Sequence, residues 1–185
     1  MFSSLTHLPT ADLDSLRGHV MFVGAGPGDP SLLTMAAVTA LNSADVVLAN
    51  SAHLLDLVQQ QPAVKLAPET LVTDLSASTE GLVPSSQARA TLVRQAALGG
   101  RKVVRLVPGD PFLDGGAIAE AAALARTGMN FEVIPGVSSL TAIPEYAGVA
   151  LSENSEVHYV VALDEDFFSH EDRHWGELPT IIVQT

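Results

Sequence analysis

The sequence predicts an open, mostly parallel α/β sheet with flanking helices. Short apolar runs, among them residues 19–23, 45–50 and 103–107, alternate with segments of helical periodicity. Short loops join these segments, and turns rich in glycine and proline follow three of the apolar runs. Strands that alternate with helices in this way form parallel sheets, which bind ligands at the carboxyl ends of their strands.

The first strand leads into the turn Gly-Ala-Gly-Pro-Gly-Asp-Pro at residues 24–30. Its three glycines within five residues permit positive φ angles and let another group approach the main chain. Pro27 and Pro30 remove two backbone donors and stiffen the turn. Asp29 is placed to cap a helix that begins at Pro30, where the missing N–H has no cost.

The letters Pro-Gly-Asp-Pro return at residues 108–111, directly after the apolar run 103–107. A third turn, Pro-Gly-Val-Ser-Ser, follows the apolar segment 131–134. In a parallel sheet all three turns lie at the same edge. The repetition of one turn at two strand ends therefore predicts a single ligand cleft.

The other elements follow from apolar periodicity. Helical spacing extends over residues 30–42, and residues 45–50 have the composition of a buried parallel strand. The sequence then predicts, in order, a helix at 51–61, a loop region at 63–84 with one short strand, a helix at 85–99, a strand at 102–107, a helix at 117–127, a strand at 131–134 and a helical stretch that ends at residue 146.

The chain divides into three expected parts. Residues 1–18 have weak periodicity, which is typical of a mobile leader. Residues 19–150 form the N-terminal α/β domain. Residues 151–185 contain two predicted strands and a loop, which cannot bury a core alone, so we interpret them as the beginning of a truncated C-terminal α/β domain.

Composition excludes several classes of function. The formal net charge of −12 opposes binding to nucleic acid or to an anionic membrane. With no cysteine, the chain has no disulfide, thiolate metal site or catalytic thiol. No apolar run approaches the ~20 residues of a membrane span, and the first residues lack the pattern of a signal peptide. We therefore expect a soluble, cytoplasmic protein.

Other motifs are weaker. The first turn departs from the dinucleotide fingerprint, because its third glycine comes one position early, and no Gly-Lys-Ser/Thr of a P-loop occurs. Residues 170–174 match H-E-x-x-H, but a solvated acidic loop is the favoured interpretation of so short a stretch, and no metal site is predicted. Glu120 is either a surface charge or a cleft carboxylate, and its spacing alone favours the surface. Asp29 and Asp110 are either helix caps or ligand-binding groups.

Three motifs together resemble those of the tetrapyrrole methylases. They are residues 23–30 with Leu-Leu-Thr at 32–34, the run 103–106 that leads into Gly-Asp-Pro-Phe at 109–112, and residues 133–139 ahead of Tyr-Ala-Gly at 146–148. The resemblance extends from about residue 19 to the end of the chain, with the motifs in the family's order and at similar spacing. Within the family, the motifs are most similar to those of uroporphyrinogen-III C-methyltransferase.

The resemblance implies a two-domain α/β enzyme, a homodimer when full length, that binds S-adenosylmethionine between its domains and releases S-adenosylhomocysteine. It implies methylation of a tetrapyrrole, with C-methylation of uroporphyrinogen III for cobalamin or sirohaem as the expected reaction. A small-molecule tetrapyrrole is then the partner, with no nucleic acid or membrane. By motif position, the cofactor contacts fall on Pro27, Pro108, Gly109, Asp110, Leu113, Ser138, Ser139 and Thr185.

The sequence also departs from the family pattern on the substrate side. Asn50 stands where the family usually has an aspartate thought to act as a base, and an amide cannot act as a carboxylate base. Gly116 replaces an arginine, and a usually basic loop ahead of residues 85–99 is neutral. No catalytic residue is assigned. These departures support the alternative of a degenerate, inactive structural or regulatory domain, for example in a fusion with uroporphyrinogen-III synthase.

Overall fold

The computed structural model describes residues 18–75, 84–113, 117–151, 156–160 and 180–184. Its main element is a five-stranded, all-parallel sheet in the order β3-β2-β4-β1-β5. This confirms the predicted fold class. The strands are β1 (His19–Gly24), β2 (Val46–Ala49), β3 (Leu71–Asp74), β4 (Lys102–Val107) and β5 (Phe131–Ile134).

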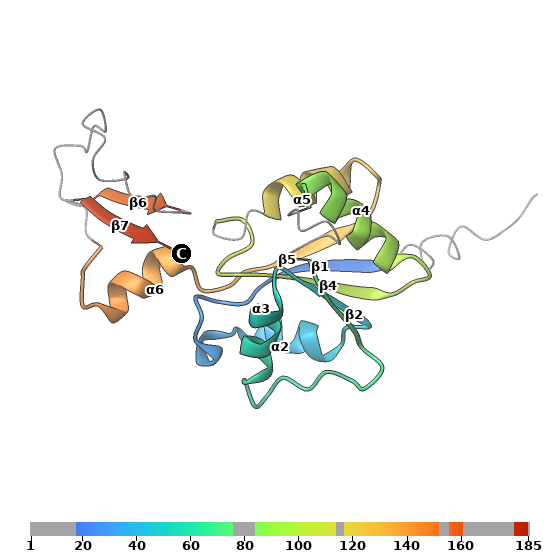
Figure 1. The fold of residues 1–185 in the computed structure, drawn as a ribbon, viewed down its shortest axis with the longest axis horizontal. Helices are drawn as coiled ribbons and strands as arrows, with labels where there is room; N and C mark the ends of the chain where they lie inside the picture. The colour runs from blue at the N-terminus through green and yellow to red at the C-terminus, as the bar shows by residue number, and fades with distance from the viewer. Residues whose placement is uncertain (1–17, 76–83, 114–116, 152–155, 161–179, 185) are drawn as a thin grey trace, which may run out of the picture.

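Helices cover both faces of the sheet (Figure 1). On one face lie α2 (Met35–Asn42) and α3 (Ala52–Gln59), and on the other lie α4 (Ser86–Ala97) and α5 (Ala117–Ala125). The core accordingly has two clusters, one on each side of the sheet. Alternate residues of β4 serve both, since Val104 packs with α2 and α3 whereas Val103 packs with α4 and α5.

Successive strands are added toward one side of the sheet after β1 and toward the other side after β4. The connections from β1 to β2 and on to β3 carry α2 and α3, whereas the return to β4 and β5 carries α4 and α5. The loops that leave β1 and β4 therefore pass to opposite faces, although these two strands are neighbours. Such a switch point is where open α/β sheets bind their ligands.

The first helical segment is shorter than predicted. The expected helix at residues 30–42 is a 3₁₀ turn, η1 (Pro30–Leu32), followed by α2 from Met35. Leu33 is extended, and Thr34 caps α2 by accepting a hydrogen bond from the amide of Ala37 at 3.1 Å. Apolar spacing continues through this break, so periodicity alone could not reveal it.

The remaining elements form where the sequence predicts them, including β3 inside the long loop region and α6 (Ser139–Tyr146). Beyond them, β6 (Glu156–Val160) and β7 (Thr180–Gln184) pair in parallel as a separate two-stranded sheet. That these strands begin a second domain stays a prediction. Residues 1–17, the motif at 170–174, Gly116 and Thr185 lie outside the described residues.

Helix length and hydropathy bear on membrane insertion. None of the helices within the described ranges is long and apolar enough to cross a bilayer.

Candidate functional site

The two Gly-Asp-Pro turns are hydrogen-bonded to each other. Gly109 N donates to Gly26 O at 2.8 Å, and Gly26 N donates to Gly109 O at 3.3 Å. This bridge is possible because β1 and β4 pair in register, with Gly24 opposite Val107. Gly26 has φ +78°, a conformation that favours glycine. The turns share one edge, as predicted, and they lie at the switch point.

The third turn packs against the first two. A Cβ on Gly24 would lie only 2.6 Å from the amide nitrogen of Gly136, so both positions need the absence of a side chain. Gly136 N also donates to Asp110 Oδ2 at 3.3 Å, and Thr34 Oγ1 donates to Pro135 O at 3.4 Å. Backbone from three neighbouring strands thus meets at one place.

Asp110 is held by main-chain donors. Its Oδ1 atom accepts hydrogen bonds from Phe112 N at 2.9 Å and Leu113 N at 3.2 Å, in addition to the bond from Gly136. The carboxylate therefore caps the turn after β4 and fastens it to the turn after β5. This supports the interpretation of Asp110 as a cap.

Asp29 has the same role in the first turn. Its Oδ1 atom accepts from Ser31 N at 2.8 Å and Ser31 Oγ at 2.6 Å, and Tyr146 donates to Oδ2 at 3.3 Å. The Ser31 hydrogen bonds, above all that of the hydroxyl, hold the pKa of Asp29 below its usual 3.8. Partial desolvation and the neighbouring Asp29 carboxylate raise the pKa of Tyr146.

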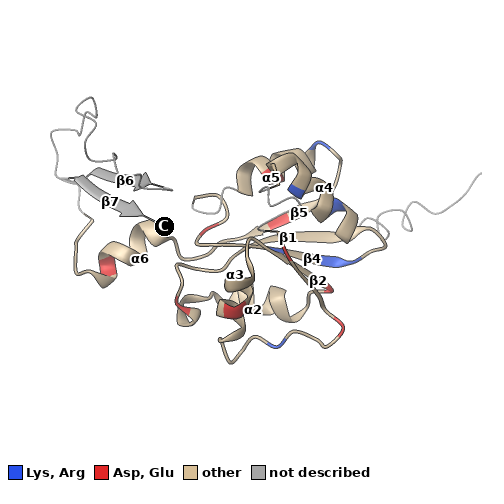
Figure 2. Cartoon of the chain, in the orientation of Figure 1, with Lys and Arg blue, Asp and Glu red and all other residues tan. Residues whose placement is uncertain are grey.

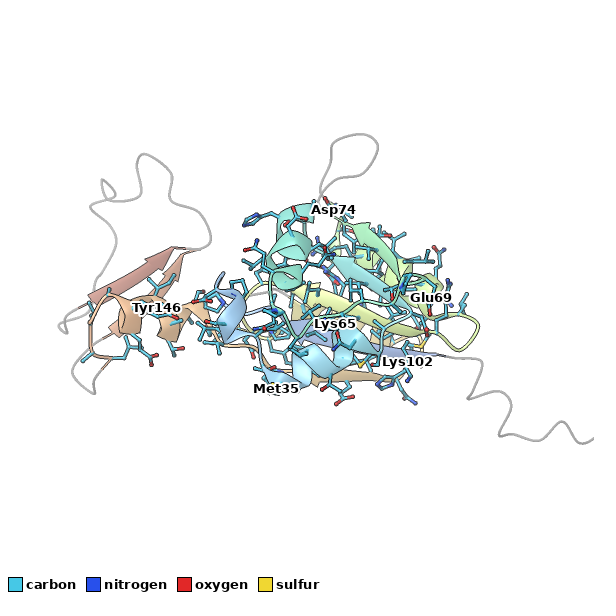
Figure 3. The ribbon with its side chains drawn as sticks, turned by 90° about the horizontal axis from the view of Figure 1, so that it is seen from below. Met35, Lys65, Glu69, Asp74, Lys102 and Tyr146 are labelled. Atoms are coloured by element: carbon cyan, nitrogen blue, oxygen red, sulfur yellow. The ribbon has the colours of Figure 1, made fainter. Side chains whose placement is uncertain are left out.

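The Tyr146 contact connects α6 to the first turn. Figure 3 shows Tyr146 on the side of the molecule remote from Lys102, the first residue of β4. Tyr146 therefore belongs to the edge at which the strands end, together with the three turns.

The predicted cofactor contacts distribute over these turns. Pro27 and Pro108 lie in the two bonded turns beside Gly109 and Asp110, and their carbonyl oxygens accept no hydrogen bond from any described residue. Leu113 is 55% exposed. Ser138 is buried and caps α6 by accepting from Leu140 N at 3.1 Å, and Ser139 beside it is buried as well. Thr185 lies outside the described residues.

A buried ionic cluster that local sequence patterns do not predict lies near this edge. Glu120, placed on the surface by its spacing, is only 1% exposed, and so is Arg105. Arg105 donates from Nε to Glu120 Oε2 at 2.8 Å and from Nη2 to Oε1 at 2.9 Å. Arg89 of α4 also pairs with Oε1 and donates to Pro84 O at 2.7 Å. The surface prediction for Glu120 is wrong, because two guanidinium groups compensate its charge inside the protein.

Arg105 uses its other donors within β4 and at the end of β2. Its Nη1 atom donates to Leu106 O at 2.8 Å and Leu48 O at 3.3 Å, and Nη2 donates to Asn50 Oδ1 at 2.6 Å. An arginine within an apolar strand was the one available signal of this cluster, since a charge at a buried strand position requires a partner.

Comparison with known proteins identifies the family to which the chain belongs. The sequence profile of the Tetrapyrrole (Corrin/Porphyrin) Methylases matches residues 19–184. The chain belongs to the tetrapyrrole methylases. Siroheme synthase 1 of Pectobacterium atrosepticum is 38% identical over 148 residues, which are 78% of this chain and 29% of that protein. The chain thus spans less than a third of the length of this curated relative.

Solved structures of the family share the fold. A cobalt precorrin-4 methyltransferase is 26% identical, with a TM-score of 0.62 over 86% of this chain and 64% of that one. Uroporphyrin-III C-methyltransferase of Thermus thermophilus, complexed with S-adenosylhomocysteine, is 32% identical, with a TM-score of 0.54 over 78% of this chain and 60% of that one. Tetrapyrrole methylases use S-adenosylmethionine as methyl donor.

The turns fit the chemistry of that cofactor. S-adenosylmethionine carries a sulfonium, an ammonium and ribose hydroxyls, which all favour hydrogen-bond acceptors or negative charge. The carbonyls of Pro27 and Pro108, which no described residue uses as acceptors, and the carboxylate of Asp110 supply both. The hydrogen bonds between the turns hold these acceptors together before any ligand binds.

Proposed function

We propose that this chain is the cofactor-binding part of an S-adenosylmethionine-dependent methyltransferase that methylates uroporphyrinogen III at carbon. The observation that carries the proposal is the bonded pair of turns at the switch point, Gly26 with Gly109. When bound, the cofactor supplies an activated methyl group on sulfur.

The chain's own contribution is positioning. Pro27, Pro108 and Asp110 would hold the cofactor's polar groups, while Leu113 offers apolar surface. Methyl transfer is an in-line displacement, so fixing the angle between donor and acceptor carbon supplies much of the rate. The remaining contacts, on Gly109, Ser138, Ser139 and Thr185, are proposed from motif position alone.

The identity of the substrate rests on relatives. The siroheme synthase of Pectobacterium atrosepticum and the uroporphyrin-III C-methyltransferase of Thermus thermophilus both exceed 30% identity over most of this chain. These likenesses support uroporphyrinogen III over other tetrapyrroles. We further propose a homodimer when full length, acting in the cytoplasm.

Asn50 favours a second candidate, a catalytically inactive structural or regulatory domain. Its side-chain oxygen accepts from Arg105 at 2.6 Å, and the amide offers no carboxylate base. An active enzyme of this kind would need another group to take the proton released by the methylated ring.

Two measurements on the full-length protein separate the candidates. Calorimetric titration with S-adenosylhomocysteine measures the cofactor site, and transfer of labelled methyl from S-adenosylmethionine to uroporphyrinogen III measures the reaction. Binding with transfer supports the enzyme. Binding without transfer supports the inactive domain, and absence of binding contradicts the proposed cofactor site.

A further inference from the structure

We propose that Asn50, held by the buried cluster of Arg105, Glu120 and Arg89, is a hydrogen-bond donor that binds a carboxylate of the substrate. The inference rests on the proposed function, because it names the part of an acidic tetrapyrrole that this edge would recognise. It assigns a binding role, rather than a catalytic one, to the residue that follows β2.

The orientation of the Asn50 amide follows from the chemistry of its neighbour. A guanidinium group has donors and no acceptor, so the atom of Asn50 that lies 2.6 Å from Arg105 Nη2 must be the oxygen. The opposite amide orientation would set N–H against N–H. The nitrogen Nδ2 therefore faces away from the cluster with two N–H groups. No described residue accepts a hydrogen bond from it, and the side chain is half-buried.

Arg105 holds this orientation firmly. Its side chain is 1% exposed, and each of its three nitrogens donates to an oxygen of Glu120, Asn50 or the main chain. An amide bound to such an anchored group cannot reverse without leaving a buried donor unpaired, which costs about 1–3 kcal/mol. Asn50 thus presents donors, and no acceptor, to a ligand.

The charge of the cluster favours an anion at this position. Two guanidinium groups and one carboxylate give +2 − 1 = +1, and Asn50 adds nothing. This local positive charge lies in a chain of net charge −12. Figure 2 shows basic residues on α4 and β4, the elements that carry Arg89 and Arg105.

Among the described residues, the carboxylates of Asp29, Asp74 and Asp110 at this edge form no hydrogen bond with either arginine of the cluster. Asp110 accepts hydrogen bonds from three main-chain amides of the turns. Asp74 pairs in register with Ala49, so it lies on the α2 and α3 side of the sheet, opposite Arg105. Figure 3 shows Asp74 at the end of β3.

The position of Asn50 suits a substrate group. It directly follows β2, which pairs with β4, so it lies one strand from the switch point where the cofactor would bind. A ligand carboxylate would accept a charge-assisted hydrogen bond from Nδ2 and offset the excess positive charge.

The test measures binding of uroporphyrin III, a stable polycarboxylate porphyrin, to the full-length protein by fluorescence titration. We expect Asn50→Ala to raise the Kd for uroporphyrin about tenfold, the size of one hydrogen bond to a charged group. Asn50→Leu retains the size of the side chain without a donor, so we expect a similar increase, about tenfold. In both variants the Kd for S-adenosylhomocysteine should change less than about twofold, because neither substitution removes a proposed cofactor contact.

Two variants that each lose one positive charge separate the effect of local charge from that of overall charge. Arg89→Gln removes the excess positive charge of the cluster and should raise the Kd for uroporphyrin several-fold. Lys102→Gln removes an equal charge from the exposed first residue of β4, at the opposite edge of the sheet, and should leave it unchanged. Thermal midpoints close to that of the wild type would show that the variants fold.

Different outcomes contradict the inference about Asn50 and the proposed function. If the wild type binds uroporphyrin and both Asn50→Ala and Asn50→Leu bind it equally well, Asn50 is no carboxylate-binding residue and the proposed function stands. If the wild type binds S-adenosylhomocysteine but no uroporphyrin, the proposed substrate is wrong and the inference falls with it.

Discussion

Arg105 and Glu120 form a two-point ion pair between β4 and α5, in which Nε and Nη2 of the guanidinium donate to both carboxylate oxygens at 2.8 and 2.9 Å. Both side chains are 1% exposed, so water contributes almost nothing to their solvation. The pair fixes α5 against the sheet directly below the turn that carries Asp110. It therefore links the stability of the fold to the shape of the proposed site.

Loss of Glu120 should strongly destabilise the protein. Glu120→Ala leaves two guanidinium groups without their anion, and breaking a buried pair by removing one partner costs about 3–5 kcal/mol. The matched control is Glu132→Ala, which removes a carboxylate that pairs with His19 at 3.4 Å on the surface. That change should cost about 0–1 kcal/mol. Urea unfolding measures both, and equal losses would contradict a buried role for Glu120.

A methyl group at position 24 should disturb the cofactor site. In Gly24→Ala the new Cβ would clash with Gly109 O and lie 2.6 Å from Gly136 N, so the turns after β4 and β5 must move away from β1. We expect S-adenosylhomocysteine to bind at least tenfold more weakly, the equivalent of about 1.4 kcal/mol. Gly128→Ala is the control for backbone effects. Gly128 has φ +74° and no atom near its Cβ position, so this variant is strained but leaves the turns in place. Calorimetry should show unchanged affinity for Gly128→Ala.

Asp110 should matter for cofactor binding through the turns that it fastens. Asp110→Ala removes the acceptor for three amides, those of Phe112, Leu113 and Gly136. Loss of a capping carboxylate costs about 0.5–2 kcal/mol of stability. Beyond that cost, we expect a clear loss of S-adenosylhomocysteine affinity. Asp56→Ala, on the exposed side of α3, removes the same charge away from the turns and should retain affinity. Calorimetric titration of both variants with S-adenosylhomocysteine separates the effect of losing a negative charge from the effect of losing it in the turn.

The turns at the carboxyl edge could be predicted from the sequence because their chemistry is local. Glycine frees the backbone at its own position, and proline restricts it. The repeat of Gly-Asp-Pro after two apolar runs indicated that β1 and β4 end at the same edge of the sheet. The order of the strands, with β4 inserted between β2 and β1, is a matter of long-range pairing that local pattern does not encode.

The ionic cluster could not be predicted for the same reason. Glu120 and Arg89 lie 31 residues apart in sequence and meet only because α4 and α5 pack on one face of the sheet. A glutamate in an alanine-rich helix has the same local pattern whether it is solvated or buried. The break at Leu33 escaped prediction differently, because a cap at Thr34 restarts the helix without changing the apolar period.

The Asp29 carboxyl should titrate below its usual pKa of 3.8, since Ser31 donates two hydrogen bonds to the ionised form. A lowered pKa in the folded state stabilises the protein above the unfolded pKa, and this contribution is lost as the pH falls through the lowered value. Carboxyl NMR titration measures the midpoint directly. Ser31→Ala should raise it more than Tyr146→Phe does, because the Ser31 hydroxyl bond, 2.6 Å long, is the largest cause and the Tyr146 bond, 3.3 Å long, is a small one. A larger rise in Tyr146→Phe would instead make the contact with α6 the main restraint on the first turn.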